Sequence, residues 1–156
     1  MTLNNPYSNL DIAHLINNDN LKIHDITTIK ANMIDDMFKT QSYAVVYYNN
    51  PHSQIGHWVV CIKLNDNTVE IFNPAGTRSG YSLYDKKLKV MFMRVGYHVM
   101  FNKKNLQDGP ESQTCGRWVI ARILGRHTPL PLWLKLFIKK GVKPDDMIMK
   151  MFAIAL

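Results

Sequence analysis

Cys115 and His57 are the two residues whose types and settings predict catalysis. Cys115 closes a polar loop and opens an apolar run typical of a helix. Its thiol therefore lies at a predicted helix N-terminus, where the helix dipole favours a thiolate. His57 lies between Gly56 and Trp58 at the head of a predicted strand. An imidazole near the thiol can pair with the thiolate and later donate its proton to a leaving amine, which predicts nucleophilic catalysis by cysteine.

Asn73 is the residue expected to orient the histidine, because a catalytic imidazole needs an acceptor on its second nitrogen. It ends a strand that should neighbour the strand starting at His57, and its carbonyl oxygen can accept the imidazole hydrogen bond. A neutral amide stabilises an imidazolium less than a carboxylate does. The two nearby acids are poorer alternatives, since Asp66 lies in the far turn of the same hairpin and Glu70 is mid-strand and should face elsewhere.

The loop before Cys115 supplies the candidates for an oxyanion hole, which needs a donor besides the backbone amide of the nucleophile. Gln107 and Gln113 both carry side-chain amides. Gln113 is so close to Cys115 in sequence that its side chain should point elsewhere, whereas the loop after Gln107 contains a glycine and a proline by which it can fold back. We therefore favour Gln107. Gly116 leaves space for a substrate to approach the sulfur.

Each of these residues also has an ordinary structural explanation. A cysteine at a helix start is often a small buried hydrophobic residue, and an asparagine before proline is a common turn residue. Tryptophans are more typical of a core than of a site. The other histidines that compete for the role of base are His52, His98 and His127. The ordered set of His57, Asn73, Gln107 and Cys115 is a stronger indication than any one member.

The composition predicts one compact domain over residues 1–156. The chain begins without the basic and apolar regions of a signal peptide, and no apolar run is long enough to span a bilayer. Both features favour a virion or host-cell interior and no membrane contact. Cys61 and Cys115 are expected to be free thiols, and two cysteines without clustered histidines argue against a zinc site.

The net charge of +7 and the pI near 9.4 raise the question of a polyanionic partner. The basic residues are spread along the chain, and no RNA-binding or zinc-finger signature accompanies them. A solvated basic surface and nonspecific DNA binding both agree with this charge.

The periodicity of the apolar residues predicts an α+β fold, in which helices pack around a small antiparallel or mixed sheet. The expected helices are 8–16, 28–38, 84–94, 118–124, 130–140 and one that begins at Pro144. The expected strands are 42–48, 58–64, 68–72 and 96–101. The first three strands form an antiparallel meander, with residues 65–67 as a tight turn.

Three segments together resemble the adenovirus-type (adenain-like) maturation proteases and the related Ulp-type SUMO proteases. They are the Gly56-His57-Trp58 block, the strand end 71–74 and the run 107–116. These families use the order His, then Asp, Glu or Asn, then Gln and Cys. The resemblance covers roughly residues 42–124 and implies a papain-like cysteine protease core. It makes His57 the base, Asn73 the orienting group, Gln107 the oxyanion donor and Cys115 the nucleophile.

The resemblance also implies a function and a substrate class. Trp58 would shape a narrow cleft, and cleavage would occur at glycine-containing sites of viral capsid or structural precursor proteins. Adenovirus-type members associate with DNA, which would give the basic surface a purpose. We expect a monomer that binds polypeptide substrates and needs no cofactor.

Three alternatives stay open from the sequence. The first is an isopeptidase of ubiquitin-like modifiers, which shares the same site. The second is a non-catalytic structural protein that keeps the fold, favoured by asparagine in place of the commoner acid. The third is an acyltransferase of the bacterial effector type, with a similar histidine-acid-cysteine order.

Overall fold

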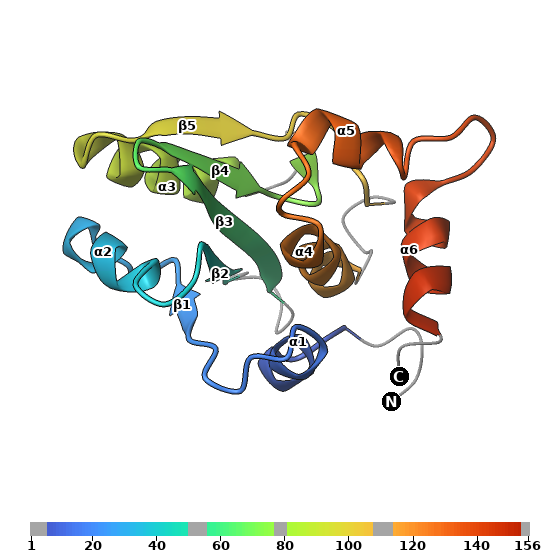
Figure 1. Cartoon of the computed structure of the whole chain (residues 1–156), viewed down its shortest axis with the longest axis horizontal. Helices are drawn as coiled ribbons and strands as arrows, with labels where there is room; N and C mark the ends of the chain where they lie inside the picture. Colours follow the sequence, from blue (N-terminus) through green and yellow to red (C-terminus); the bar gives the residue numbers. More distant parts are fainter. Residues whose placement is uncertain (1–5, 50–55, 77–80, 108–113, 154–156) are drawn as a thin grey trace.

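A five-stranded mixed sheet forms the centre of the molecule, in the order β1-β2-β3-β4-β5 (Figure 1). The computed structural model describes residues 6–49, 56–76, 81–107 and 114–153. The strands are β1 (Ile23–Asp25), β2 (Tyr43–Tyr48), β3 (His57–Asn65), β4 (Thr68–Phe72) and β5 (His98–Phe101). β2, β3 and β4 pair antiparallel, whereas β1 and β5 join the two edges in parallel. The predicted α+β class is confirmed.

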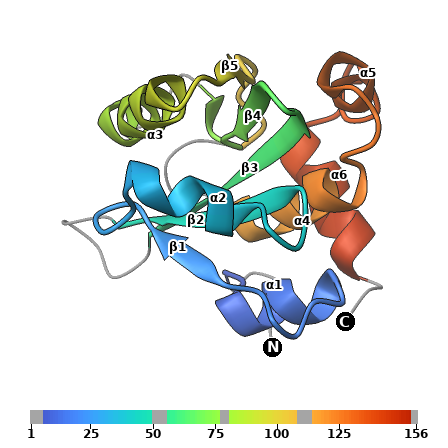
Figure 2. The same ribbon diagram turned by 60° about the vertical axis from the view of Figure 1, so that its left-hand side comes forward.

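Helices cover both faces of this sheet, as Figure 2 shows for α3 on one side and α4 on the other. The helices are α1 (Asn9–Leu15), η1 (Ala31–Met33), α2 (Ile34–Met37), α3 (Ser82–Arg94), α4 (Cys115–Leu124), α5 (Leu130–Lys135) and α6 (Pro144–Ala153). Among the described residues, no helix is both long and apolar enough to cross a membrane.

Alternation along the strands sends apolar side chains to both faces and so builds two cores. Val45 and Val60 face a cluster that includes Trp118 of α4. Val46 and Val59 face a second cluster with Leu88, Met91 and Phe92 of α3. Because both faces of β2 and β3 are buried, these strands appear in the sequence as nearly continuous apolar runs.

Most predicted elements are present, and three differ. The helix predicted within residues 28–38 is present as the short η1 and α2. The helix predicted over 130–140 ends at Lys135, and Lys139 instead bridges to Val142. The edge strand β1 was not predicted because it has three residues, all half-buried, and so carries no alternation to detect.

A buried ion pair joins the sheet to α4. Arg122 Nε lies 2.8 Å from Glu70 Oε2, and Arg122 Nη2 lies 2.9 Å from Oε1, with both side chains essentially inaccessible to solvent. Arg122 Nη1 also donates to the carbonyl oxygens of Gly125 and Thr128. Glu70 therefore faces away from Asn73, as predicted, and connects β4 to α4 and the turn that follows it.

Removing one partner of this pair should destabilise the fold strongly, because it leaves the other charge buried and uncompensated. We expect Glu70→Gln and Arg122→Met each to lower the free energy of unfolding by about 3–5 kcal/mol in urea denaturation. The double variant Glu70→Leu/Arg122→Met should lose much less, and exposed Lys135→Met should change little. Equal losses in the single and double variants would contradict a coupled pair.

Candidate active site

Cys115 begins α4 and lies almost fully buried against β3. The backbone N–H groups of Trp58, Gly116 and Cys115 itself lie close enough to the sulfur to lower the thiol pKa. Since Trp58 follows His57 in β3, the thiol lies near the start of that strand. Burial nevertheless has the larger effect and raises the pKa of the Cys115 thiol to about 11, with nearby Asp145 contributing in the same direction.

His57 begins β3 and its ring points to Asn73, which directly follows β4. His57 Nε2 lies 2.7 Å from Asn73 Oδ1, and both side chains are buried. The β3–β4 pairing of Val60 with Phe72 brings these two strand ends together. The sequence analysis predicted this contact between the imidazole of His57 and the amide of Asn73.

The orientation of the Asn73 amide is fixed on both sides, which determines the histidine tautomer. The backbone N–H of Ala75 donates to Asn73 Oδ1 at 3.0 Å, so that atom is the oxygen. Asn73 Nδ2 faces the carboxylate of Asp85, at 3.3 and 3.2 Å. His57 must therefore donate through Nε2–H to this oxygen, and its Nδ1 keeps the lone pair that can take a proton.

The imidazole of His57 packs against the rings of Tyr81 and Tyr48. The ring of Tyr81 stacks on His57 with the centroids 4.9 Å apart and an interplanar angle of 6°. Burial lowers the pKa of His57 to about 4, although the hydrogen bond to Asn73 acts in the opposite direction. These two shifts, in His57 and Cys115, favour a neutral imidazole and a neutral thiol over the ion pair that the helix dipole favours.

Asp85 of α3 is a site residue that the sequence did not reveal. Besides accepting from Asn73, its Oδ1 accepts the hydroxyl of Tyr48 at 2.7 Å. Burial raises the pKa of the Asp85 carboxyl, while the bonds from Tyr48 and Asn73 lower it. Asp85 thus places an acid behind the neutral amide, one hydrogen bond further from the histidine. It lies twelve residues after Asn73 on a different element, so no local pattern signals it.

Asn102 holds the backbone of Asn73 in place. Its Oδ1 accepts Asn73 N–H at 2.8 Å, and its Nδ2 donates to the Asn73 carbonyl oxygen at 2.6 Å.

The segment after Asn73 also packs against residues 104–106. Leu106 N–H donates to the carbonyl oxygen of Pro74. At Gly76, with φ of +60°, an added Cβ would lie 2.8 Å from the backbone of Lys104 and Asn105, so the two segments pack backbone to backbone.

Gln107 is brought next to the nucleophile through Thr114, the residue before Cys115. Gln107 Nε2 lies 3.5 Å from Thr114 Oγ1, which is a long contact. Thr114 Oγ1 donates to Asp145 Oδ1 at 2.6 Å, and Trp118 Nε1 donates to the same oxygen at 2.9 Å. The sequence placed Asp145 in the first turn of α6, but did not show that its buried carboxylate anchors the start of α4.

Trp58 and Gly116 pack against the N-terminal segment. Trp58 Nε1 donates to the carbonyl oxygen of Tyr7 at 2.9 Å. A Cβ at Gly116 would lie 2.8 Å from Tyr7 Cβ and 3.5 Å from Trp58 Cδ1. Close packing on Tyr7 is therefore a reason for glycine at this position, separate from the substrate access predicted for it.

Two of the remaining candidates, His98 and His127, do not join this site. His98 and His127 are exposed, and His98 pairs with Thr68, at the other end of β4 from Asn73. His52 and Gln113 lie outside the described residues. Cys61 and Cys115 are free thiols, as predicted. Among the described residues, no group of three or more His, Cys, Asp or Glu side chains is arranged to hold a metal ion.

A sequence match to a known family covers the five strands and α4. Residues 16–132 match the model of the SidE DUB domain, a span of well over half the chain. The chain belongs to the SidE DUB domain family. The matched range contains His57, Asn73, Gln107 and Cys115, and membership of a deubiquitinase-domain family supports a cysteine protease or isopeptidase.

Other similarities are more distant. Protein V9 of the Sputnik virophage, described as uncharacterized, is 26% identical over 134 residues, covering 77% of this chain and 76% of V9. The ASFV pS273R protease superposes with a TM-score of 0.48 at 15% identity, covering 97% of this chain and 68% of its own. The Chlamydia abortus effector ChlaDUB gives 0.47 at 14% identity, covering 80% and 62%. These structural similarities are loose, and the family assignment rests on the sequence match.

The pKa values predict the pH dependence of thiol alkylation. Since the thiolate is the reactive form and the Cys115 pKa is raised to about 11, iodoacetamide should react slowly at neutral pH. The rate should rise about tenfold per pH unit in alkaline solution, until the pKa is reached. Mass spectrometry should find the label on Cys115, with none on buried Cys61 in Cys115→Ser. A rate plateau between mildly acidic and neutral pH would instead reveal a thiolate–imidazolium pair.

Proposed function

We propose that the protein is a cysteine isopeptidase with Cys115 as nucleophile, His57 as base, Asn73 as orienting group and Gln107 as oxyanion donor. The observation that carries this proposal is the 2.7 Å contact between His57 Nε2 and Asn73 Oδ1, at the end of the sheet where the Cys115 thiol lies near the Trp58 amide. It brings a nucleophile and a base of defined tautomer to one end of the sheet.

The tautomer suggests the direction of each proton transfer. His57 Nδ1 takes the proton of the Cys115 thiol as the sulfur attacks the substrate carbonyl. The oxyanion that forms accepts hydrogen bonds from Gln107 Nε2 and the Cys115 amide. The C–N bond then breaks, the leaving amine receives the proton from Nδ1, and a thioester remains on the sulfur. Water, deprotonated by His57, hydrolyses that thioester and restores the thiol.

Asp85 can compensate for the neutral side chain of Asn73, which stabilises an imidazolium less than a carboxylate would. While His57 carries the extra proton, its Nε2–H bond to Asn73 strengthens, and the amide is polarised by the Asp85 carboxylate on its other side. The negative charge sits one side chain further from the imidazole than in a His–Asp pair. Asp85 is thus proposed as a positioning residue that also compensates for the neutral amide.

Family membership favours ubiquitin or a ubiquitin-like protein as the substrate. A second candidate is the processing of viral capsid or structural precursors at glycine-containing sites, for which the virophage relative supports only a viral setting. The catalytic steps would be the same in both, since each cleaves an amide through a thioester. Nonspecific DNA binding by the basic surface would belong to the second candidate.

Covalent capture separates the two candidates. A ubiquitin that carries an electrophile at its C-terminus should form an adduct with the wild-type protein, detected by a gel shift. The adduct should be absent in Cys115→Ser, reduced in His57→Ala and unchanged in the matched control Cys61→Ser. Cleavage of a viral precursor without ubiquitin capture would favour the second candidate. If Cys115→Ser loses neither activity, the proposed nucleophile is wrong.

Variants of Asp85 test the compensating acid. Asp85→Ala removes the acceptor behind Asn73 and should slow adduct formation by about ten- to hundredfold, the usual effect of one hydrogen bond to a charged group. Asp85→Asn keeps an acceptor but no charge and should fall between Asp85→Ala and wild type. Tyr48→Phe removes the other bond to Asp85 without touching Asn73 and should have a smaller effect. Wild-type rates in Asp85→Ala would contradict the role.

A further inference from the structure

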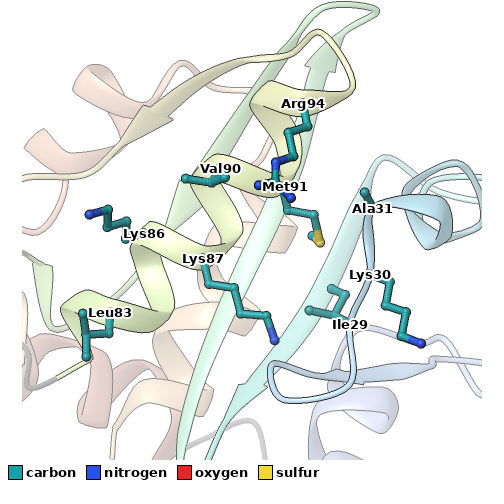
Figure 3. Close-up of a pocket in the computed structure, with 9 residues that line it drawn as sticks. All are labelled: Ile29, Lys30, Ala31, Leu83, Lys86, Lys87, Val90, Met91 and Arg94. Carbon is teal, nitrogen blue, oxygen red and sulfur yellow. The ribbon is translucent and has the colours of Figure 1, made fainter.

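An open groove lies on the face of α3 that points away from the catalytic histidine. It has a volume of about 550 Å³ and runs between α3 and residues 29–31 (Figure 3). Lys87 and Met91 extend from α3 toward Ile29 across the groove. Asp85, by contrast, lies on the inner side of the same helix, where it contacts Tyr48 and Asn73.

The groove combines positive charge with exposed apolar surface. All the described residues that line it are basic or apolar, and none is acidic. Leu83 is 79% exposed and Val90 38% exposed, which leaves apolar surface in contact with water. Lys87 Nζ already donates to the carbonyl oxygen of Ile26 and lies near Asp25. The exposed charges that remain for a partner are Lys30, Lys86 and Arg94.

We propose that this groove binds an acidic, amphipathic segment of a partner polypeptide. Basic side chains at the rim would pair with carboxylates, and the apolar floor would receive the apolar face of the segment. A nucleic acid fits less well, because no aromatic ring among the described lining residues could stack on bases, and the exposed leucine and valine offer nothing to phosphates. This inference does not depend on the proposed catalytic function.

The spacing along α3 defines the partner more closely. Lys86 and Arg94 are eight residues apart, which is about 12 Å along a helix, and Leu83 and Val90 are separated by about 10 Å. Two turns of a partner helix have nearly the same length. We therefore expect carboxylates about two turns apart and leucine-like residues at a spacing of about seven, with the two sets offset by about one turn.

Fluorescence anisotropy with the full chain tests this surface directly. The probe is a labelled peptide of about four helical turns, with glutamates and leucines arranged on one face at this spacing. Two comparison probes are a scrambled peptide of the same composition and a short DNA duplex. The variants are Lys86→Glu/Arg94→Glu and Leu83→Ser/Val90→Ser. The matched control, Lys139→Glu/Lys140→Glu, makes the same change in net charge at exposed positions after α5.

The patterned peptide should bind more tightly than the scrambled one. Its affinity should fall by at least about tenfold in Lys86→Glu/Arg94→Glu and severalfold in Leu83→Ser/Val90→Ser, and should hold in the control. Urea midpoints for every variant should match wild type. Equal affinity for both peptides, equal losses in the control, or DNA binding that exceeds peptide binding and is lost in Lys86→Glu/Arg94→Glu would each overturn the proposal.

Discussion

The register of the β3–β4 hairpin is the constraint on which the candidate site depends. Opposing Val60 to Phe72 brings the start of β3 and the end of β4 to the same edge of the sheet, so that His57 and Asn73 come within hydrogen-bonding distance. A shift by one residue would turn every side chain of the shifted strand to the other face, so that each would have to pack into the opposite core. The hydrophobic effect that fixes the sheet therefore also fixes the distance between base and orienting group.

Asn73 shows how a buried polar group is satisfied by residues from distant parts of the chain. Its side chain meets His57, Ala75 and Asp85, and its backbone meets Asn102. Burying an amide costs free energy unless its donors and acceptors are paired, and here each half of the side-chain amide has a partner. The same partners that make burial tolerable leave the amide one orientation, and hence leave the imidazole one tautomer.

Burial has a second consequence for the electrostatics of the site. It raises the pKa of Cys115 and lowers that of His57, and so favours a neutral pair although α4 begins at the cysteine. The helix dipole and the nearby amides favour a thiolate. The loss of solvent on burial has the larger effect and favours the neutral thiol. Proton transfer from the Cys115 thiol to His57 is therefore most favourable when a substrate carbonyl is bound for the sulfur to attack.

The sequence by itself determined the α+β class, most strands and helices, and the order of His57, Asn73, Gln107 and Cys115, because periodicity and short motifs are local properties. Their catalytic roles stay predictions. Local patterns could not reveal Asp85, Asn102 or Asp145, since each acts through a partner on another element. They also could not give the protonation of the site, which depends on how completely the fold removes water. Only the tertiary structure decided which acid stands behind Asn73 and that burial shifts the pKa values of Cys115 and His57 in opposite directions.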